Sequence, residues 1–166
     1  IIHGNRPVLA NDVAQRIMYN NLKTIGGINY NRREMKFANE IYKTLRNPGL
    51  DLESAGEVQP YGFRKGKGST DVGDVSWMVP TARLRIATWV PGTSAHTWQA
   101  VSAGGMSIGM KGMVNAAKVI AGAAFDLYND PETIKNAKKE LIERRGPEFN
   151  YYSLLGERDP PLDYRK

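Results

Sequence analysis

The sequence predicts a single irregular α/β domain that is rich in helices and has few strands. Helical periods run through the first fifty residues and return between residues 103 and 145, whereas a short alternating segment near residue 85 is typical of a strand. The 166 residues show no internal repeat, and 41% of them are hydrophobic, which suffices for one sizeable core. We therefore expect one domain over residues 1–146 and a tail over residues 147–166.

Two amphipathic helices are expected before residue 50. The first begins after Asn11, a favourable N-cap residue, and stops at Gly26. The second follows Asn31, with Glu34 in the capping-box position, and ends at residues 47–49 (NPG). Their apolar stripes consist of Val13, Ile17, Met18, Leu22 and Ile25 in the first helix and Phe37, Ile41 and Leu45 in the second. Both stripes are expected to lie in the core.

The middle of the chain carries the expected strands. No helical period is sustained between residues 49 and 80, where one short strand is expected near residues 58–63. Apolar and polar residues then alternate from Ala82 towards Val90, and Pro91 and Gly92 close this second predicted strand.

Small residues dominate the next segment. The run of Gly, Ala and Met between Ala103 and Leu127 predicts one long buried helix whose surface lets another backbone or a ligand come close. Asp130 and Pro131 then start a last helix, which Gly146 ends.

Charge and composition limit the possible partners and compartment. The net charge is +6, but the basic residues are scattered and do not alternate with aromatics, so we expect no nucleic-acid partner. No long apolar run predicts a membrane segment. The absence of cysteine excludes disulfides and thiolate metal sites and favours a reducing, cytoplasmic compartment. The first residues, IIHG, indicate a fragment or a processed product.

Two glycine-rich loops beside the second predicted strand hold the candidate chemistry. His96 follows that strand, at a position where ligands of open α/β sheets gather, and is either a metal ligand or catalytic base or else a surface histidine. Asp71 and Asp74 suit metal ligation, orientation of a ligating imidazole, or helix capping. Gly104 and Gly105, ahead of a helix, offer backbone N–H groups to an anion. One histidine and two aspartates do not complete a catalytic zinc site.

Three motifs carry a family resemblance that covers most of the chain up to about Glu140. They are GSTDVGDVSW at residues 68–77, PGTSAHTWQ at 91–99, and GMSIGMKGM at 105–113 with AAK at 116–118. With these motifs the chain resembles the zinc metallopeptidases of the aminoacylase and carboxypeptidase G type, in the amidohydrolase branch that contains aminobenzoyl-glutamate hydrolases. The resemblance implies the C-terminal portion of a three-layer αβα catalytic domain, without the inserted lid domain.

The resemblance also implies a role for each candidate residue. In this family two metal ions, zinc or alternatively manganese, lower the pKa of a bridging water and polarise the carbonyl of an amide beside a free carboxylate. His96 is then the last metal ligand, and Asp71 or Asp74 orients it or fixes its loop. Gly104, Gly105 and Ser107 are expected to receive the substrate carboxylate. No catalytic residue is expected in this segment, since the general base belongs to an N-terminal part, and His3 is expected to be non-catalytic.

The implied substrate is a small N-acyl or aminobenzoyl amino acid or a peptide. The segment alone is expected to be inactive, and the full-length protein to form a homo-oligomer or to pair with a related subunit. The alternative from another class is a non-catalytic interaction module that docks a partner subunit through its glycine-rich face.

Overall fold

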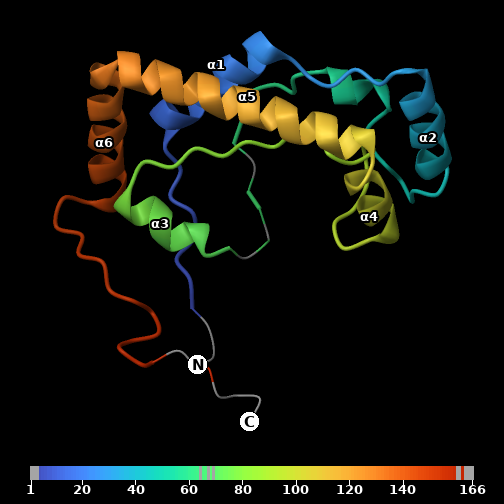
Figure 1. The fold of residues 1–166 in the computed structure, drawn as a ribbon. Coiled ribbons are helices and arrows are strands. Elements are labelled where there is room, and N and C mark those ends of the chain that lie inside the picture. Colours follow the sequence, from blue (N-terminus) through green and yellow to red (C-terminus); the bar gives the residue numbers. More distant parts are fainter. Residues whose placement is uncertain (1–3, 64, 67, 69, 160–161, 163–166) are drawn as a thin grey trace. The chain divides into compact units, whose positions relative to one another are not determined.

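The computed structural model describes residues 4–63, 65–66, 68, 70–159 and 162, and these residues are helix-rich as predicted (Figure 1). The elements in chain order are α1 (Asp12–Ile25), α2 (Arg32–Tyr42), the 3-10 turn η1 (Glu53–Gly56), α3 (Val72–Met78), α4 (Trp98–Gly104), α5 (Ser107–Asn129) and α6 (Pro131–Arg145). None of the helices in these ranges is long and apolar enough to span a membrane. His3 lies outside the described residues.

The chain divides into two compact units, each of which is assembled from separate stretches of sequence. The terminal unit comprises the described residues of 1–14, 64–82 and 132–166, and the central unit comprises residues 15–63 and 83–131. Because neither unit is continuous along the chain, no shift in composition marks this division. The predicted boundary at residue 146 stays a prediction.

Helix α1 begins where its N-cap residue predicts. The Asn11 side chain accepts a hydrogen bond from the Ala14 N–H (2.9 Å) and donates one to the Ala137 carbonyl (2.8 Å). Gly26, at φ +83°, ends the helix in the left-handed conformation that glycine adopts freely. The apolar stripe of α1 was predicted to lie in the core. Its residues Val13, Ile17, Met18 and Leu22 are only half-buried, and no residue of the helix is fully buried.

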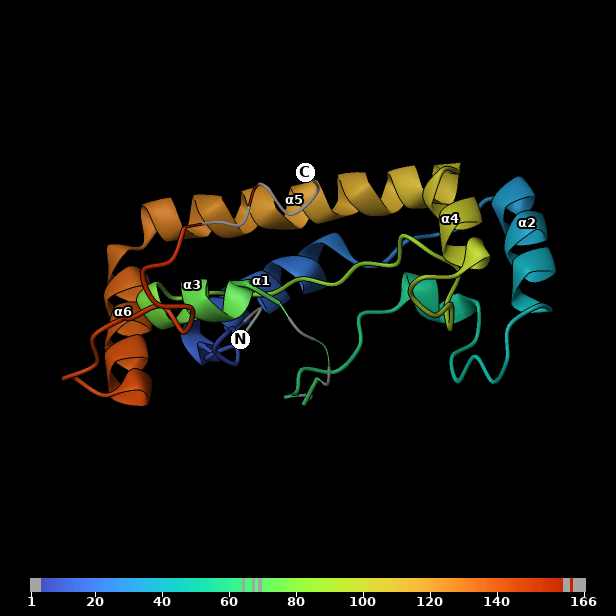
Figure 2. The ribbon, with the colours of Figure 1, turned by 90° about the horizontal axis from the view of Figure 1, so that it is seen from below.

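Helix α2 helps to build the main core of the central unit. Its capping box is formed as predicted, and Ile41 of its stripe is buried. The buried cluster consists of Ala38, Ile41, Leu52, Val90, Ala103 and Ile108. Figures 1 and 2 show α2 and α4 at the same end of α5, which places this core near the beginning of α5.

The single long helix predicted from Ala103 onwards is instead two helices. Helix α4 ends at Gly104, and the extended backbone of Met106 (ψ 173°) precedes α5. The prediction that this segment is buried holds for one side of α5 only. Residues such as Val119 and Ala123 are buried, whereas Ile120 is 53% exposed.

Neither predicted strand is formed among the residues that the structure describes. Residues 58–63 and 82–90 are irregular because no second strand pairs with them. The Gln15 side-chain amide bonds both the N–H and the C=O of Arg83, each at 2.8 Å, in place of a neighbouring strand. Gly112 of α5 lies close to this segment, and a Cβ there would stand 2.8 Å from the Ala87 carbonyl oxygen. The three-layer αβα arrangement stays a prediction.

Candidate functional site

The central unit contains a buried carboxylate that is fully engaged by hydrogen bonds. Glu34 is 4% exposed and accepts hydrogen bonds from the Asn31 N–H (2.7 Å), the Ser107 hydroxyl (2.7 Å) and the Lys111 ammonium (2.6 Å). Lys111 also donates to the Asn29 carbonyl (3.0 Å). We call Asn29, Asn31, Glu34, Ser107 and Lys111 the Glu34 network. It ties the beginning of α2 to the beginning of α5.

Local sequence explains how each helix presents its part of the network. The capping box places Glu34 at the third position of α2, where its carboxylate turns back towards the Asn31 N–H. Ser107 and Lys111 are four residues apart on α5 and therefore share one helix face. The sequence separation between Glu34 and Ser107 is 73 residues, so the pairing of the two helices is a tertiary feature.

The network controls the protonation of Glu34. Burial alone raises the pKa of a carboxyl group. Here the hydrogen bonds from Lys111, Asn31 and Ser107, together with the charge of Lys111, outweigh burial and lower the pKa of Glu34 from 4.5 to about 2. Burial and the charge of Glu34 raise the pKa of the neighbouring Tyr30 to about 12. Glu34 is therefore a charged anchor and not a proton carrier near neutral pH.

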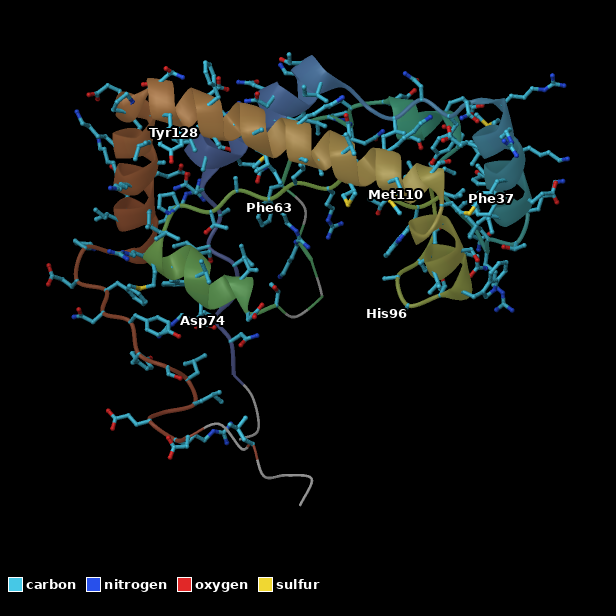
Figure 3. The ribbon with its side chains drawn as sticks, viewed as in Figure 1. Phe37, Phe63, Asp74, His96, Met110 and Tyr128 are labelled. Atoms are coloured by element: carbon cyan, nitrogen blue, oxygen red, sulfur yellow. The ribbon has the colours of Figure 1, made fainter. Side chains whose placement is uncertain are left out.

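A groove of about 480 Å³ opens beside the network, between the turn at residues 27–29 and one face of α5. Its lining residues are Gly27, Ile28, Asn29, Ser107, Met110, Lys111, Val114, Asn115 and Lys118. Figure 3 labels Met110 near the start of α5. The groove combines two lysines with an apolar wall, and no carboxylate is among the residues that line it.

The residues predicted to bind a substrate carboxylate lie at the turn between α4 and α5. Gly104 and Gly105 are exposed there. The Ser107 hydroxyl donates its one proton to Glu34, so it is not free to donate to a second carboxylate in this arrangement. Their role in substrate binding stays a prediction.

His96 is exposed at the tip of the loop that leads into α4 (Figure 3). Its φ of +61° is rare for a residue with a side chain and occurs often at functional positions. Thr97 fixes the loop, because its hydroxyl donates to the Ser94 carbonyl (2.8 Å) and accepts from the Ala100 N–H (3.3 Å). The contacts found among the described residues include no hydrogen bond or ion pair of the imidazole.

Asp71 and Asp74 belong to the terminal unit, whereas His96 belongs to the central unit. The interpretation of Asp74 as a helix cap was wrong, because α3 begins at Val72 and Asp74 lies in its first turn. Asp71 stands at the N-cap position but makes no capping bond. The Asp74 carboxylate instead accepts a hydrogen bond from the Arg6 N–H (3.4 Å), which binds α3 to the N-terminal segment.

No metal centre is complete within the part of the chain that the structure describes. No three histidine, cysteine, aspartate or glutamate side chains gather there in a way that could hold a metal ion. A single exposed imidazole supplies one ligand, and a catalytic zinc site needs about three protein ligands. The described residues alone therefore do not fit a bound metal pair.

The third sequence motif contains Lys111 and Lys118 but assigned neither a role, and the sequence gave Glu34 only its capping role. The signal that was present is the spacing of Ser107, Lys111 and Lys118, which places all three on similar sides of one helix. The same spacing is also typical of a helix face exposed to solvent. It indicates a site only together with the buried carboxylate of Glu34, which bonds Ser107 and Lys111.

Comparison with known proteins gives an informative relative. No protein-family model matches the chain, and no solved structure matches it. One of the subunits of p-aminobenzoyl-glutamate hydrolase from Escherichia coli (strain K12) is 32% identical over 157 residues. The match covers 80% of this chain and 33% of the relative, so the chain spans about a third of the length of that protein. The chain is therefore a homologue of this p-aminobenzoyl-glutamate hydrolase protein, which confirms the resemblance to aminobenzoyl-glutamate hydrolases, whereas the metallopeptidase type stays a prediction.

Proposed function

We propose that the chain is part of a metal-dependent amidohydrolase that cleaves an amide bond beside a free carboxylate, with an N-acyl or aminobenzoyl glutamate as the substrate class. The observation that carries the proposal is the match to the p-aminobenzoyl-glutamate hydrolase protein over 80% of the chain. The related protein is named as one subunit of its enzyme, which favours pairing with a related subunit. A cytoplasmic location remains part of this proposal.

In this proposal the chain supplies a C-terminal portion of the catalytic domain, including one metal ligand. His96 is the ligand, since its imidazole is exposed and its backbone is held in a rare conformation. The remaining ligands of a metal pair, zinc or manganese, come from polypeptide that corresponds to the unmatched two-thirds of the relative. The role expected for Asp71 or Asp74, to orient His96 or to fix the loop that carries it, stays a prediction.

The unpaired segment at residues 82–90 fits the same proposal. Arg83 and Arg85 are exposed while Leu84 and Ile86 are half-buried, which is the alternation of a strand with one covered face. We infer that this segment pairs with a strand from outside the 166 residues and so completes one layer of an αβα domain.

An activity assay with matched substrates tests the proposed function. A family-length polypeptide that carries this sequence is expected to release p-aminobenzoate from p-aminobenzoyl-glutamate, and the 166-residue chain alone is expected to release none. Blocking the free carboxylates as methyl esters should lower the rate at least tenfold, because the charged hydrogen bonds to them are lost. The absence of hydrolysis for every N-acyl amino acid in the longer polypeptide would contradict the proposal.

One observation favours a second function, that of an interaction module. Helix α5 exposes an apolar face along its length, and contiguous exposed apolar patches often mark sites of protein–protein interaction. The exposed members of this face are Met106, Met110, Met113, Val114, Ile120, Phe125 and Tyr128. A protein that binds a partner subunit through this face, and keeps that binding after loss of His96, would perform this second function without hydrolysis.

Ile120→Glu separates the two functions. The substitution places a charge in the middle of the exposed face and is expected to abolish partner binding if the chain is a docking module. For a matched control, Ile134→Glu changes a partly exposed isoleucine on α6. If neither variant alters association with a related subunit, the second function is wrong.

A further inference from the structure

We propose that the groove between residues 27–29 and α5 binds the dicarboxylate end of the substrate, with Lys118 and Lys111 as its anion-binding residues. This inference deepens the proposed function and rests on it for the identity of the ligand. The groove itself is defined by this chain alone, so its binding chemistry can be measured independently of hydrolysis.

The polar walls of the groove are held in place before any ligand arrives. Glu34 and the Asn29 carbonyl fix the Lys111 ammonium at 2.6 and 3.0 Å. The Asn115 side-chain amide donates to the Gly26 carbonyl at 2.9 Å, which links the middle of the groove on α5 to the turn opposite. A site whose polar groups are already oriented loses less conformational freedom on binding.

Two cationic groups remain able to receive an anion. An ammonium group has three donors, and Lys111 uses two of them within the Glu34 network, while its side chain stays 40% exposed. Lys118 is exposed, and no ion pair or hydrogen bond of its ammonium occurs among the contacts of the described chain. Since Glu34 balances Lys111, the groove carries a net positive charge from Lys118.

The spacing of the two lysines favours a ligand with two carboxylates. They are seven residues apart on α5, which is about 10 Å along the axis and nearly the same angular position. Their flexible side chains can converge on two carboxylates of one small molecule. A ligand with a single carboxylate would engage only one of the two ammonium groups and would leave the third donor of Lys111 or the charge of Lys118 unused.

The rest of the groove is suited to the body of an N-acyl amino acid. Ile28, Met110 and Val114 provide an apolar wall between the polar groups. Binding sites for small molecules commonly have this composition and enclose several hundred cubic ångströms. The Ser107 hydroxyl, which donates to Glu34, serves the site by holding the network and not by binding the anion.

The experiment follows methionine methyl groups by NMR while the 166-residue chain is titrated with N-benzoyl-glutamate. Met110 lines the groove, whereas Met113 lies on the same helix outside it and is similarly exposed (52% and 59%). We expect a saturable shift of the Met110 methyl signal without one at Met113. N-benzoyl-glycine, which has one carboxylate, is expected to bind about tenfold more weakly, because a charge-assisted hydrogen bond contributes at least that factor.

Lys118→Gln is expected to weaken binding of N-benzoyl-glutamate about tenfold or more. Lys138→Gln is the matched control, since it removes the same charge from an exposed position on α6. The inference is overturned if Met110 shows no saturable shift, if Met110 and Met113 shift together, or if both lysine variants weaken binding equally. If N-benzoyl-glutamate binds at Met110 but the longer polypeptide hydrolyses no substrate, the groove is an anion-binding site and the proposed function is wrong. If the longer polypeptide hydrolyses its substrate but nothing binds at Met110, the proposed function holds and the inference about the groove is wrong.

Discussion

The two units of the molecule stabilise an enclosed charge in different ways. In the central unit, the Glu34 network compensates a buried carboxylate with an ammonium group and directed hydrogen bonds. In the terminal unit, the Arg6 guanidinium carbon lies 5.3, 5.1, 5.9 and 4.7 Å from the ring centroids of Trp77, Phe149, Tyr151 and Tyr152. We call these five residues the Arg6 cluster. Two of its guanidinium nitrogens, Nε and Nη2, are buried without a hydrogen-bond partner among the described residues.

The difference shows which kind of compensation makes a structure sensitive to pH. A carboxylate that is held by donors loses its charge when it is protonated, and the network loses its attraction with it. A guanidinium group over aromatic faces keeps its charge at every pH that proteins tolerate, and cation–π attraction is less directional than a hydrogen bond. Only the central unit should therefore lose stability through its anchor when the pH falls below about 4.5.

The largest expected effect comes from removing the charge of Glu34. Glu34→Gln leaves Lys111 and the Ser107 hydroxyl facing a neutral amide, and we expect the free energy of unfolding to fall by about 3 kcal/mol, as for other broken buried pairs. Glu40→Gln is the control, because Glu40 pairs with Lys43 on the same helix but is 64% exposed. Urea denaturation followed by circular dichroism measures both variants, and equal losses would show that the network is not the anchor of the central unit.

The second prediction concerns acid. The pKa of Glu34 is about 2 in the folded chain and near 4.5 when unfolded. Its contribution to stability is therefore complete above about pH 4.5 and is lost as the pH falls towards 2. We expect a loss of about 2 kcal/mol over this range, reduced from the full shift because Lys111 is partly exposed to solvent. Denaturation of wild type and Glu34→Gln at several pH values tests this, and parallel curves would refute it.

Removal of the Arg6 guanidinium should have a smaller effect than Glu34→Gln, and this effect should not depend on pH. Arg6→Ala removes the cation from the rings, and we expect a loss of about 2 kcal/mol from the terminal unit, equal at pH 4 and pH 7. Tryptophan fluorescence reports on this unit in a background in which Trp89 and Trp98 are replaced by Phe, so that Trp77 alone remains. Arg6→Lys keeps the charge without the planar stacking and should lie between wild type and Arg6→Ala. If the loss of stability caused by Arg6→Ala becomes smaller in acid, the guanidinium has a carboxylate partner. The terminal unit would then not differ from the central unit in its response to pH.

The smallest expected effect is that of the N-cap of α2. Asn31→Ala removes the side chain that accepts from the N–H groups of Arg33 and Glu34, both at 3.0 Å, and should cost about 1 kcal/mol. The control Asn20→Ala changes an exposed position inside α1, where alanine is the better helix former. If thermal unfolding shows equal changes for the two variants, the cap does not contribute to the central unit.

Local signals predicted the helices well because caps and stop residues act within a few positions. Asn11, Asn31 and Gly26 mark helix ends that the structure confirms. The strand expected at residues 82–90 failed for a physical reason, since a strand needs a partner and Gln15 alone bonds Arg83. The α4–α5 break was missed although Gly104 and Gly105 are poor helix formers, because the small residues were interpreted as a packing surface of one helix.

The candidate site was only partly predictable. Motifs pointed to His96, Asp71 and Asp74, because each belongs to a glycine-containing sequence motif, although the structure places Asp74 in helix α3. The link from Glu34 to Ser107 and Lys111 depends on how two distant helices pack, which no local pattern records. In the sequence, Lys111 and Lys118 do not differ from ordinary surface charges. They line a groove only because the turn at residues 27–29 lies opposite them in the fold.

The assignment of His96 as a metal ligand is tested by the metal content of a family-length polypeptide that carries this sequence, measured with and without His96→Ala. Elemental analysis of the purified proteins gives the number of metal ions per chain. We expect that the His96→Ala protein retains its fold and binds one equivalent of metal less than wild type, whereas the His3→Ala protein binds as much metal as wild type. Equal metal content in all three proteins would contradict the assignment of His96 as a metal ligand.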